Sequence, residues 1–212
     1  MRTLSRTTKA VLATGFLVTS FGVAATATTA TANSADLTAN LQPVALNGVD
    51  GSGTALVTVR GTRIEVAMVA SGLLADAPHA AHIHFGADAR HECPGALADT
   101  DASGTLNTSE GGPSYGPVAV SLTKTGDTSP ASALAIDRFD TAPRGTLTYE
   151  RGRIKVTQTL AKAISSGEAV IVIHGVDHNH NGAYDGATPS DLDPSLPTEA
   201  TDPALCGVIT QS

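Results

Sequence analysis

Short segments in which apolar and polar residues alternate run through most of this 212-residue chain. The clearest segment is TALVTVRGTRIEVAMVASGL (54–73), which predicts two strands joined by a turn at Arg60-Gly61-Thr62. Because successive side chains of a strand point to opposite faces, each such segment can bury one face and expose the other. Trp is absent and aromatic residues make up only 3% of the chain, so the core has to be built from Val, Ile, Leu and Ala.

Further segments of the same kind follow along the chain. They are HAAHIHFG (79–86), YGPVAVSLT (115–123), SALAIDRF (132–139), GTLTYERGRIKVTQTL (145–160), EAVIVIHGV (168–176) and CGVIT (206–210). Many short strands separated by turn residues favour an all-β fold, a Greek-key β-barrel or sandwich. Residues 160–168 (LAKAISSGE) are compatible with one helical turn, in a chain where strands dominate. Two stretches rich in Gly, Pro, Asp, Ser and Thr, 86–116 and 177–205, are predicted to be long loops at one end of the barrel.

The N-terminal segment, residues 1–32, is predicted to be a secretory signal peptide. Arg2, Arg6 and Lys9 precede the apolar run AVLATGFLVTSFGVAA, which is short for a membrane span, and ATA (30–32) fits a cleavage site. Residues 33–212 would then form one β domain that is secreted, extracellular or held in the cell envelope. No later segment is long and apolar enough to predict a membrane span.

Charge and cysteine content narrow the possible partners and the compartment. Without residues 1–32 the chain has 10 basic and 20 acidic residues. This acidic balance argues against nucleic acid and anionic membranes as partners. The two cysteines, Cys93 and Cys206, should form a disulfide in an exported protein.

Histidines are concentrated in HAAHIHFGADARHEC (79–93), which holds four of the seven in the chain. His82 and His84 are two residues apart and therefore point to the same face of the predicted strand. His174 ends the apolar strand in VIVIHGVD. Three imidazoles suit copper or zinc, and an oxidising location favours copper.

These motifs resemble the copper/zinc superoxide dismutases. That family has an H-x-x-H-x-H strand, a cysteine nine residues after its last histidine, a later strand ending in a copper-binding histidine, and a C-terminal cysteine strand similar to LCGVI (205–209). The resemblance implies a Greek-key barrel with two long loops. It also implies copper ligands His82, His84 and His174, a structural role for His79, and the Cys93–Cys206 disulfide. The stretch LAKAISSGEAVIVIHG (160–175) also resembles the CHRD domain, a related β-sandwich module.

The chain departs from the dismutase pattern at functional positions. Ser114 stands where the family has the histidine that bridges copper and zinc, and no histidine lies between His91 and His174. Pro203 stands in place of the arginine that attracts superoxide. We therefore expect copper without zinc, and no guiding cation for the substrate.

The loop after His174 contains further candidate site residues. His178 and His180, together with His91, are candidates for an extra copper ligand or a proton donor. In the same loop Asp177, Asn179, Asn181 and Asp185 follow the start of a calcium loop, although Thr188 replaces the usual twelfth-position Glu. An Asx-rich turn held by its own side chains is the alternative.

The sequence therefore leaves three functions open. The first is an exported, copper-only superoxide dismutase-like enzyme that acts on superoxide. The second is a protein that binds copper ion without turnover. The third is a CHRD-like structural or adhesion module. The sequence specifies no oligomeric state for any of them.

Overall fold

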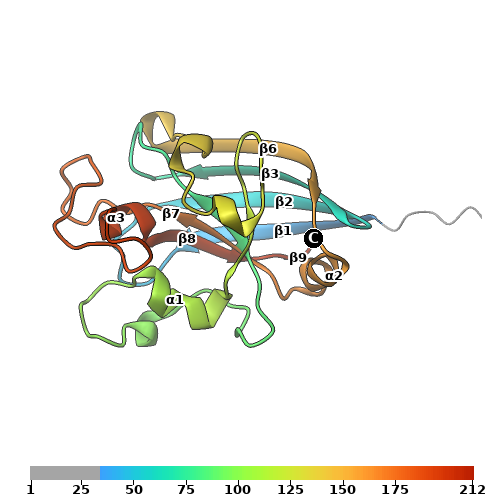
Figure 1. The fold of residues 1–212 in the computed structure, drawn as a ribbon, viewed down its shortest axis with the longest axis horizontal. Coiled ribbons are helices and arrows are strands. Elements are labelled where there is room, and N and C mark those ends of the chain that lie inside the picture. Colours follow the sequence, from blue (N-terminus) through green and yellow to red (C-terminus); the bar gives the residue numbers. More distant parts are fainter. Residues whose placement is uncertain (1–33) are drawn as a thin grey trace, which may run out of the picture. The chain divides into compact units, whose positions relative to one another are not determined.

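The computed structural model describes residues 34–212, so the predicted signal peptide (1–32) lies outside the described residues (Figure 1). Nine strands pair antiparallel in one curled sheet, in the order β5-β4-β7-β8-β1-β2-β3-β6, with β9 beside β1. The strands are β1 (Ser34–Pro43), β2 (Ser52–Arg60), β3 (Arg63–Ser71), β4 (Ala81–His84), β5 (Val118–Ser121), β6 (Thr146–Lys155), β7 (Val170–His174), β8 (Pro203–Val208) and β9 (Thr210–Gln211). The predicted all-β fold is confirmed.

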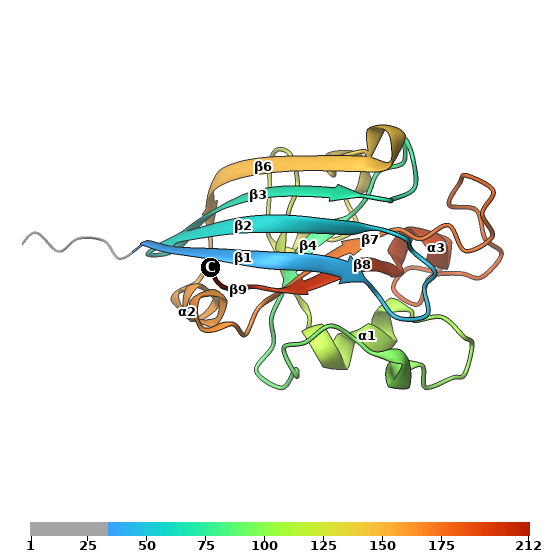
Figure 2. The same cartoon turned by 180° about the vertical axis from the view of Figure 1, so that it is seen from behind.

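The curl of the sheet gives a half-barrel with two walls. Strands β1, β2, β3 and β6 run side by side along the long axis of the molecule (Figures 1 and 2). Strand β1 joins the walls, because most of it pairs with β2 while Gln42 and Pro43 at its end pair with β8. The second wall continues through β7 and β4 to β5. Among the described residues, the sheet ends at β5 on one side and at β6 on the other.

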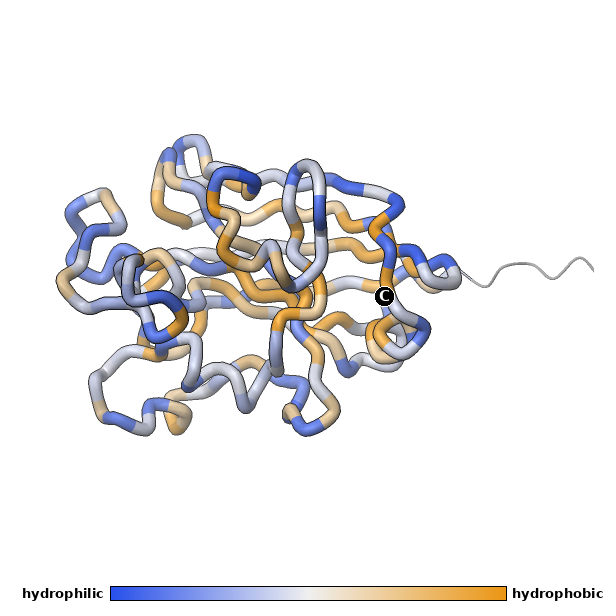
Figure 3. Tube along the Cα trace, in the orientation of Figure 1, coloured by the Kyte–Doolittle hydropathy of each residue, from blue (hydrophilic) through white to orange (hydrophobic). Residues whose placement is uncertain are grey.

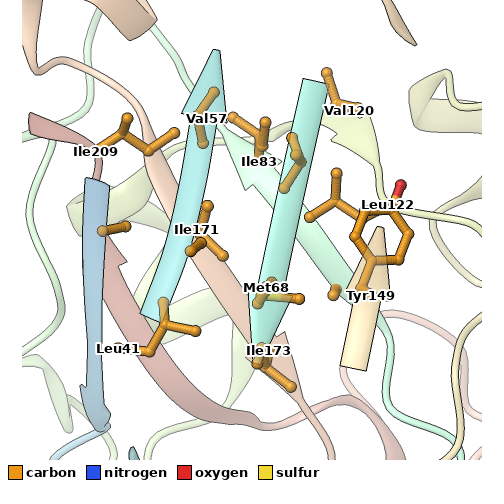
Figure 4. Close-up of a cluster of buried hydrophobic side chains, with 14 of the residues drawn as sticks. Leu41, Val57, Met68, Ile83, Val120, Leu122, Tyr149, Ile171, Ile173 and Ile209 are labelled. Carbon is orange, nitrogen blue, oxygen red and sulfur yellow. The ribbon is translucent and has the colours of Figure 1, made fainter. Parts of the chain in front are cut away.

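The hydrophobic core fills the space between the two walls. Leu41, Val57 and Met68 of the first wall face Ile83 and Ile171 of the second (Figure 4). All five side chains are at most 2% exposed. Apolar segments follow the strands, while hydrophilic segments gather in the surrounding loops (Figure 3). The hairpin predicted at residues 54–73 is confirmed as β2 and β3, paired from Ser52–Ser71 to Arg60–Arg63.

One predicted strand is wrong. Residues 132–139 (SALAIDRF) form parts of the 3₁₀ turns η2 (Pro130–Ser132) and η3 (Ile136–Arg138). Local side-chain bonds favour turns over an extended chain here. The Asp127 carboxylate accepts hydrogen bonds from the hydroxyls of Ser129 and Ser132, and Arg138 donates to the Ser132 hydroxyl.

The expectation of at most one helical turn at 160–168 is also wrong, because α2 (Gln158–Ser166) is a nine-residue helix. The Thr157 side chain accepts the N–H of Leu160 at the start, and Gly167 ends the helix in the left-handed conformation. Strand β6 accordingly stops at Lys155, before the end of the predicted segment 145–160. None of the helices within residues 34–212 is long and apolar enough to cross a membrane.

The two predicted loops contain more regular structure than expected. The first holds η1 (Ala96–Ala98) and α1 (Thr108–Tyr115), and the second holds α3 (Thr198–Thr201). The second loop ends at Asp202, because β8 begins at Pro203. A further turn, η4 (Pro143–Gly145), precedes β6.

Candidate metal centre

Strand β4 carries two functional side chains on one face and a core side chain on the other. Ile83 points into the core, whereas His82 and His84 lie on the opposite face. In the ladder with β7, His82 pairs with Val172, and His174 lies two residues further along β7 on that same face. The strand alternation therefore brings the three predicted ligands together.

The face that bears the histidines is covered by the segment between β4 and β5. Leu106 and Tyr115 of this segment pack with Val170 and Val172 in a second apolar cluster. The predicted disulfide between Cys93 and Cys206 is present and ties the segment to β8. As a result the histidines are only 2–4% exposed, although they lie outside the main core.

Each of the three rings uses one nitrogen to donate to a backbone carbonyl. His82 Nε2 lies 3.1 Å from the Ala133 oxygen, His84 Nδ1 lies 2.8 Å from the Gly116 oxygen, and His174 Nδ1 lies 2.7 Å from the Thr201 oxygen. A carbonyl only accepts, so these ring nitrogens carry the protons and fix the tautomers.

The other nitrogen of each ring is then an unprotonated acceptor. His82 Nδ1, His84 Nε2 and His174 Nε2 are buried and have no hydrogen-bond partner. The three histidines offer ligand atoms that lie within 4.8 Å of one another. Buried polar atoms nearly always have a partner, so three such atoms in one place require an explanation.

The environment keeps all three rings neutral. Burial lowers the pKa of His84 to about 3 and that of His174 to about 4, and it lowers the pKa of His82 well below 6.5. For His82, the neighbouring rings of His174 and His84 lower the pKa further. Neutral imidazole is the form that binds metal ions.

Comparison with known protein families shows which family the chain belongs to. The family model for the CHRD domain matches residues 33–183. The chain belongs to the CHRD domain family. No curated protein matched it. The resemblance to CHRD domains is thus confirmed, whereas the resemblance to copper/zinc superoxide dismutases stays a prediction.

The remaining histidines of this CHRD domain lie outside the three-histidine group. His79 is buried and contacts the backbone oxygens of His174 and Leu74 through its two ring nitrogens. His91 contacts the Gly86 oxygen at 2.8 Å through Nε2, and its ring stacks on Phe85.

The two histidines of the loop after β7 are also placed apart from the group. His178 Nε2 lies 2.8 Å from the carboxylate of Asp202, which is 1% exposed. Burial raises the pKa of Asp202, and the bond to His178 opposes that rise. His180 is exposed. His91, His178 and His180 are not part of the three-histidine group, and the extra roles predicted for them stay predictions.

The four residues of the predicted calcium loop do come together in this CHRD domain. The Asp177 carboxylate accepts the N–H groups of Asn181 and Gly182, and the Asp185 carboxylate accepts the side-chain amides of Asn179 and Asn181. These are the bonds of an Asx-rich turn, which was the alternative interpretation. Calcium at this loop stays a prediction.

Several contributors to the centre were not predicted. Ala133, Gly116 and Thr201 act through backbone oxygens, which any residue type supplies, so the sequence carries no signal for them. Phe139 and Tyr115 pack edge-on against His82 and His84, with ring centroids 5.4 and 4.5 Å apart. Both aromatic residues are 1% exposed, and they close the centre from two sides.

Proposed function

We propose that this CHRD-domain protein binds one copper ion through His82 Nδ1, His84 Nε2 and His174 Nε2, and keeps it away from solvent. The observation that carries the proposal is the group of three buried, unpartnered acceptor nitrogens. No donor satisfies them among the described residues, and a metal cation is a partner that all three can share. When bound, copper supplies one-electron chemistry between its Cu(I) and Cu(II) states.

The donor set favours copper over zinc. Structural zinc sites have four protein ligands, and catalytic zinc sites keep an open position for water. Within residues 34–212, the histidine group contains no fourth His, Cys, Asp or Glu. Burial of the ligand nitrogens also disfavours a water-accessible position. Three nitrogens without a fourth donor suit Cu(I), which accepts trigonal coordination.

An oxidising compartment agrees with this proposal. The Cys93–Cys206 disulfide is the kind of bond that persists outside the cytoplasm. We therefore propose an exported copper-binding module, in line with the signal peptide predicted at residues 1–32.

Metal analysis of the purified, oxidised protein tests the proposal. We expect one copper per chain after loading with Cu(I), and retention of that copper against a chromophoric Cu(I) chelator. His174→Ala should weaken copper binding by more than about 100-fold, because a lost ligand costs more than a lost outer-shell contact. His180→Ala, at an exposed position, is the matched control and should bind like the wild type.

Either of two results would refute a copper centre: wild-type protein that holds no copper, or a His174→Ala variant that holds it equally well. The protein would then be a CHRD scaffold with a structural or adhesive role.

Superoxide dismutation is a second candidate, favoured by the same three-nitrogen group and by the family resemblance of its sequence motifs. Two features oppose rapid turnover. The ligand nitrogens are buried, and the positions of the missing bridging histidine and guiding arginine hold Ser114 and Pro203, both of which are buried. We expect the copper-loaded protein to accelerate superoxide decay only weakly. A rate equal to that of the His82→Ala/His174→Ala double variant would remove this candidate.

A further inference from the structure

A second candidate metal site lies in the segment between β4 and β5 that covers the histidine group. Residues 99–110 (DTDASGTLNTSE) carry oxygen donors at the spacing of a twelve-residue calcium loop, which uses positions 1, 3, 5, 7, 9 and 12 and requires Gly at position 6. Taken in order, these positions hold Asp99, Asp101, Ser103, Thr105 (through its carbonyl), Asn107 and Glu110, with Gly104 sixth.

The loop lies between a single 3₁₀ turn and a helix, so only its C-terminal side matches a helix–loop–helix unit. Turn η1 (Ala96–Ala98) ends directly before Asp99, and α1 (Thr108–Tyr115) begins at the tenth position of the loop. Gly104 has φ +86°, a conformation that favours glycine at the sharp turn. Leu106 at the eighth position is fully buried in the second apolar cluster and holds the loop against the sheet.

The ligand positions converge in space. Asp99, Asp101 and Glu110 offer carboxylate oxygens within 4.8 Å of one another. Asp101, Ser103, Thr105 and Asn107, which are the third, fifth, seventh and ninth positions, line one side of a cavity between this loop and residues 178–202, whereas Asp99 and Glu110 do not line it. The alternate residues of the loop thus share one face, as a calcium loop requires.

Glu110 is the most buried of the three carboxylates. It is 9% exposed and points its carboxylate toward Asp99 and Asp101. It accepts only neutral donors, the N–H groups of Thr100, Asp101 and Asn107 and the Thr100 hydroxyl. Within the described residues no Lys, Arg or His forms an ion pair with any of the three carboxylates. Placing two negative charges beside a third that is largely buried is costly unless a cation compensates them.

We propose that the loop Asp99–Glu110 binds one Ca²⁺, with Glu110 as the twelfth-position ligand. This site is separate from the histidine centre and does not depend on copper. The loop Asp177–Asp185 is an incomplete version of the same pattern. It has Thr188 at its twelfth position, where the pattern requires Glu.

Calcium titration of the full disulfide-bonded chain, followed by amide NMR, tests the proposal. We expect saturable binding with a Kd of about 10⁻³ M or tighter, the range of extracellular calcium modules. The largest shifts should fall on the amides of residues 99–110. Mg²⁺ at the same concentration should cause much smaller shifts, because it demands a tighter octahedral site.

Variants separate the two loops. Glu110→Gln should weaken calcium binding by more than about tenfold. Asp101→Ala removes a ligand at an exposed position and serves if the Glu110 variant fails to fold. Asp177→Asn, in the other loop, and Asp137→Asn, at an exposed position elsewhere, should bind like the wild type.

Three results would overturn the site: no binding at 10 mM Ca²⁺ (about ten times the expected weakest Kd), shifts confined to residues 177–185, or an Asp101→Ala variant with unchanged affinity. None of these results bears on copper binding, so the two proposals can fail independently.

Discussion

At the scale of single residues, the candidate ligands are distinguished by the hydrogen bonding of their two ring nitrogens. One nitrogen of His82, His84 and His174 is bonded to a carbonyl, and the other is free and buried. His79 differs, because both of its nitrogens contact backbone oxygens. This difference separates candidate ligands from a histidine that holds the backbone.

His79→Ala should therefore destabilise the protein without removing the proposed copper ligands. We expect a loss of about 2–3 kcal/mol in the free energy of unfolding, because a buried side chain and its hydrogen bond to the β7 end are lost. Urea denaturation of metal-free protein measures this loss. His180→Ala, at an exposed position, should change stability by less than about 0.5 kcal/mol. Equal stability of the two variants would contradict the structural role of His79.

The lowered pKa values of the histidine group predict a pH dependence for the metal-free protein. In the unfolded chain these histidines titrate near 6.5, whereas in the fold the pKa is about 3 for His84 and about 4 for His174. The unfolded state thus binds more protons as the pH falls below about 6.5, so the free energy of unfolding should decrease from there toward pH 4. Melting temperatures measured at pH 7.5 and pH 5 test this direction.

A variant in which His82, His84 and His174 are all replaced by Gln is the control for that measurement. It should lose much less stability over the same pH range. The same loss in both proteins would mean that other groups cause the acid sensitivity.

At the scale of elements, one buried side chain connects three segments. Asn47, between β1 and β2, donates to the carbonyls of Leu106 and Pro203 and accepts the N–H of Leu106. It is 2% exposed. The covering segment and β8 therefore depend on a residue far from both in sequence.

Asn47→Ala should cost about 2–4 kcal/mol of unfolding free energy, because three buried backbone groups lose their partner. Asn40→Ala, at an exposed position of β1, is the control and should be nearly neutral. Urea denaturation of both variants tests the difference, and a neutral Asn47→Ala would show that the covering segment is held by other contacts.

Elements with strong alternation could be predicted from the sequence, and those with weak patterns could not. The β2–β3 hairpin, β4 and β7 follow from Val, Ile and Leu at alternate positions. Strand β1 was missed, although Leu37, Ala39 and Leu41 are buried, because its small and polar residues dilute the pattern. Helix α2 was underestimated because only two of its buried residues, Leu160 and Ile164, are bulky and apolar, and the other two are Ala.

The sequence predicts which histidine side chains form the candidate centre, but not the backbone groups that orient them. The H-x-H spacing on one strand and the histidine at the end of another anticipate which rings meet. The carbonyls that orient the rings could not be anticipated, because their positions depend on the tertiary path of three separate segments.

At the scale of the whole molecule, the disulfide joins two segments 113 residues apart in sequence. Its removal in a Cys93→Ala/Cys206→Ala variant should lower the free energy of unfolding by at most about 5 kcal/mol, the value that loop entropy gives for a loop of this length. The covering segment should also loosen, so a chelator should remove copper from the variant faster.

Urea denaturation and the rate of chelator-driven copper release measure these two effects. Wild-type protein treated with reductant should behave like the double variant. Unchanged stability together with unchanged release would contradict the role of the disulfide in holding the covering segment.

The alternation along β4 also has a consequence for how this family can diverge. Ile83 packs in the main core. His82 and His84 lie on the opposite face of β4 and are not part of that core. Evolution can therefore exchange the histidines for other residues, and with them the chemistry, while the inherited architecture persists. Lineages with and without the imidazole group should share one scaffold.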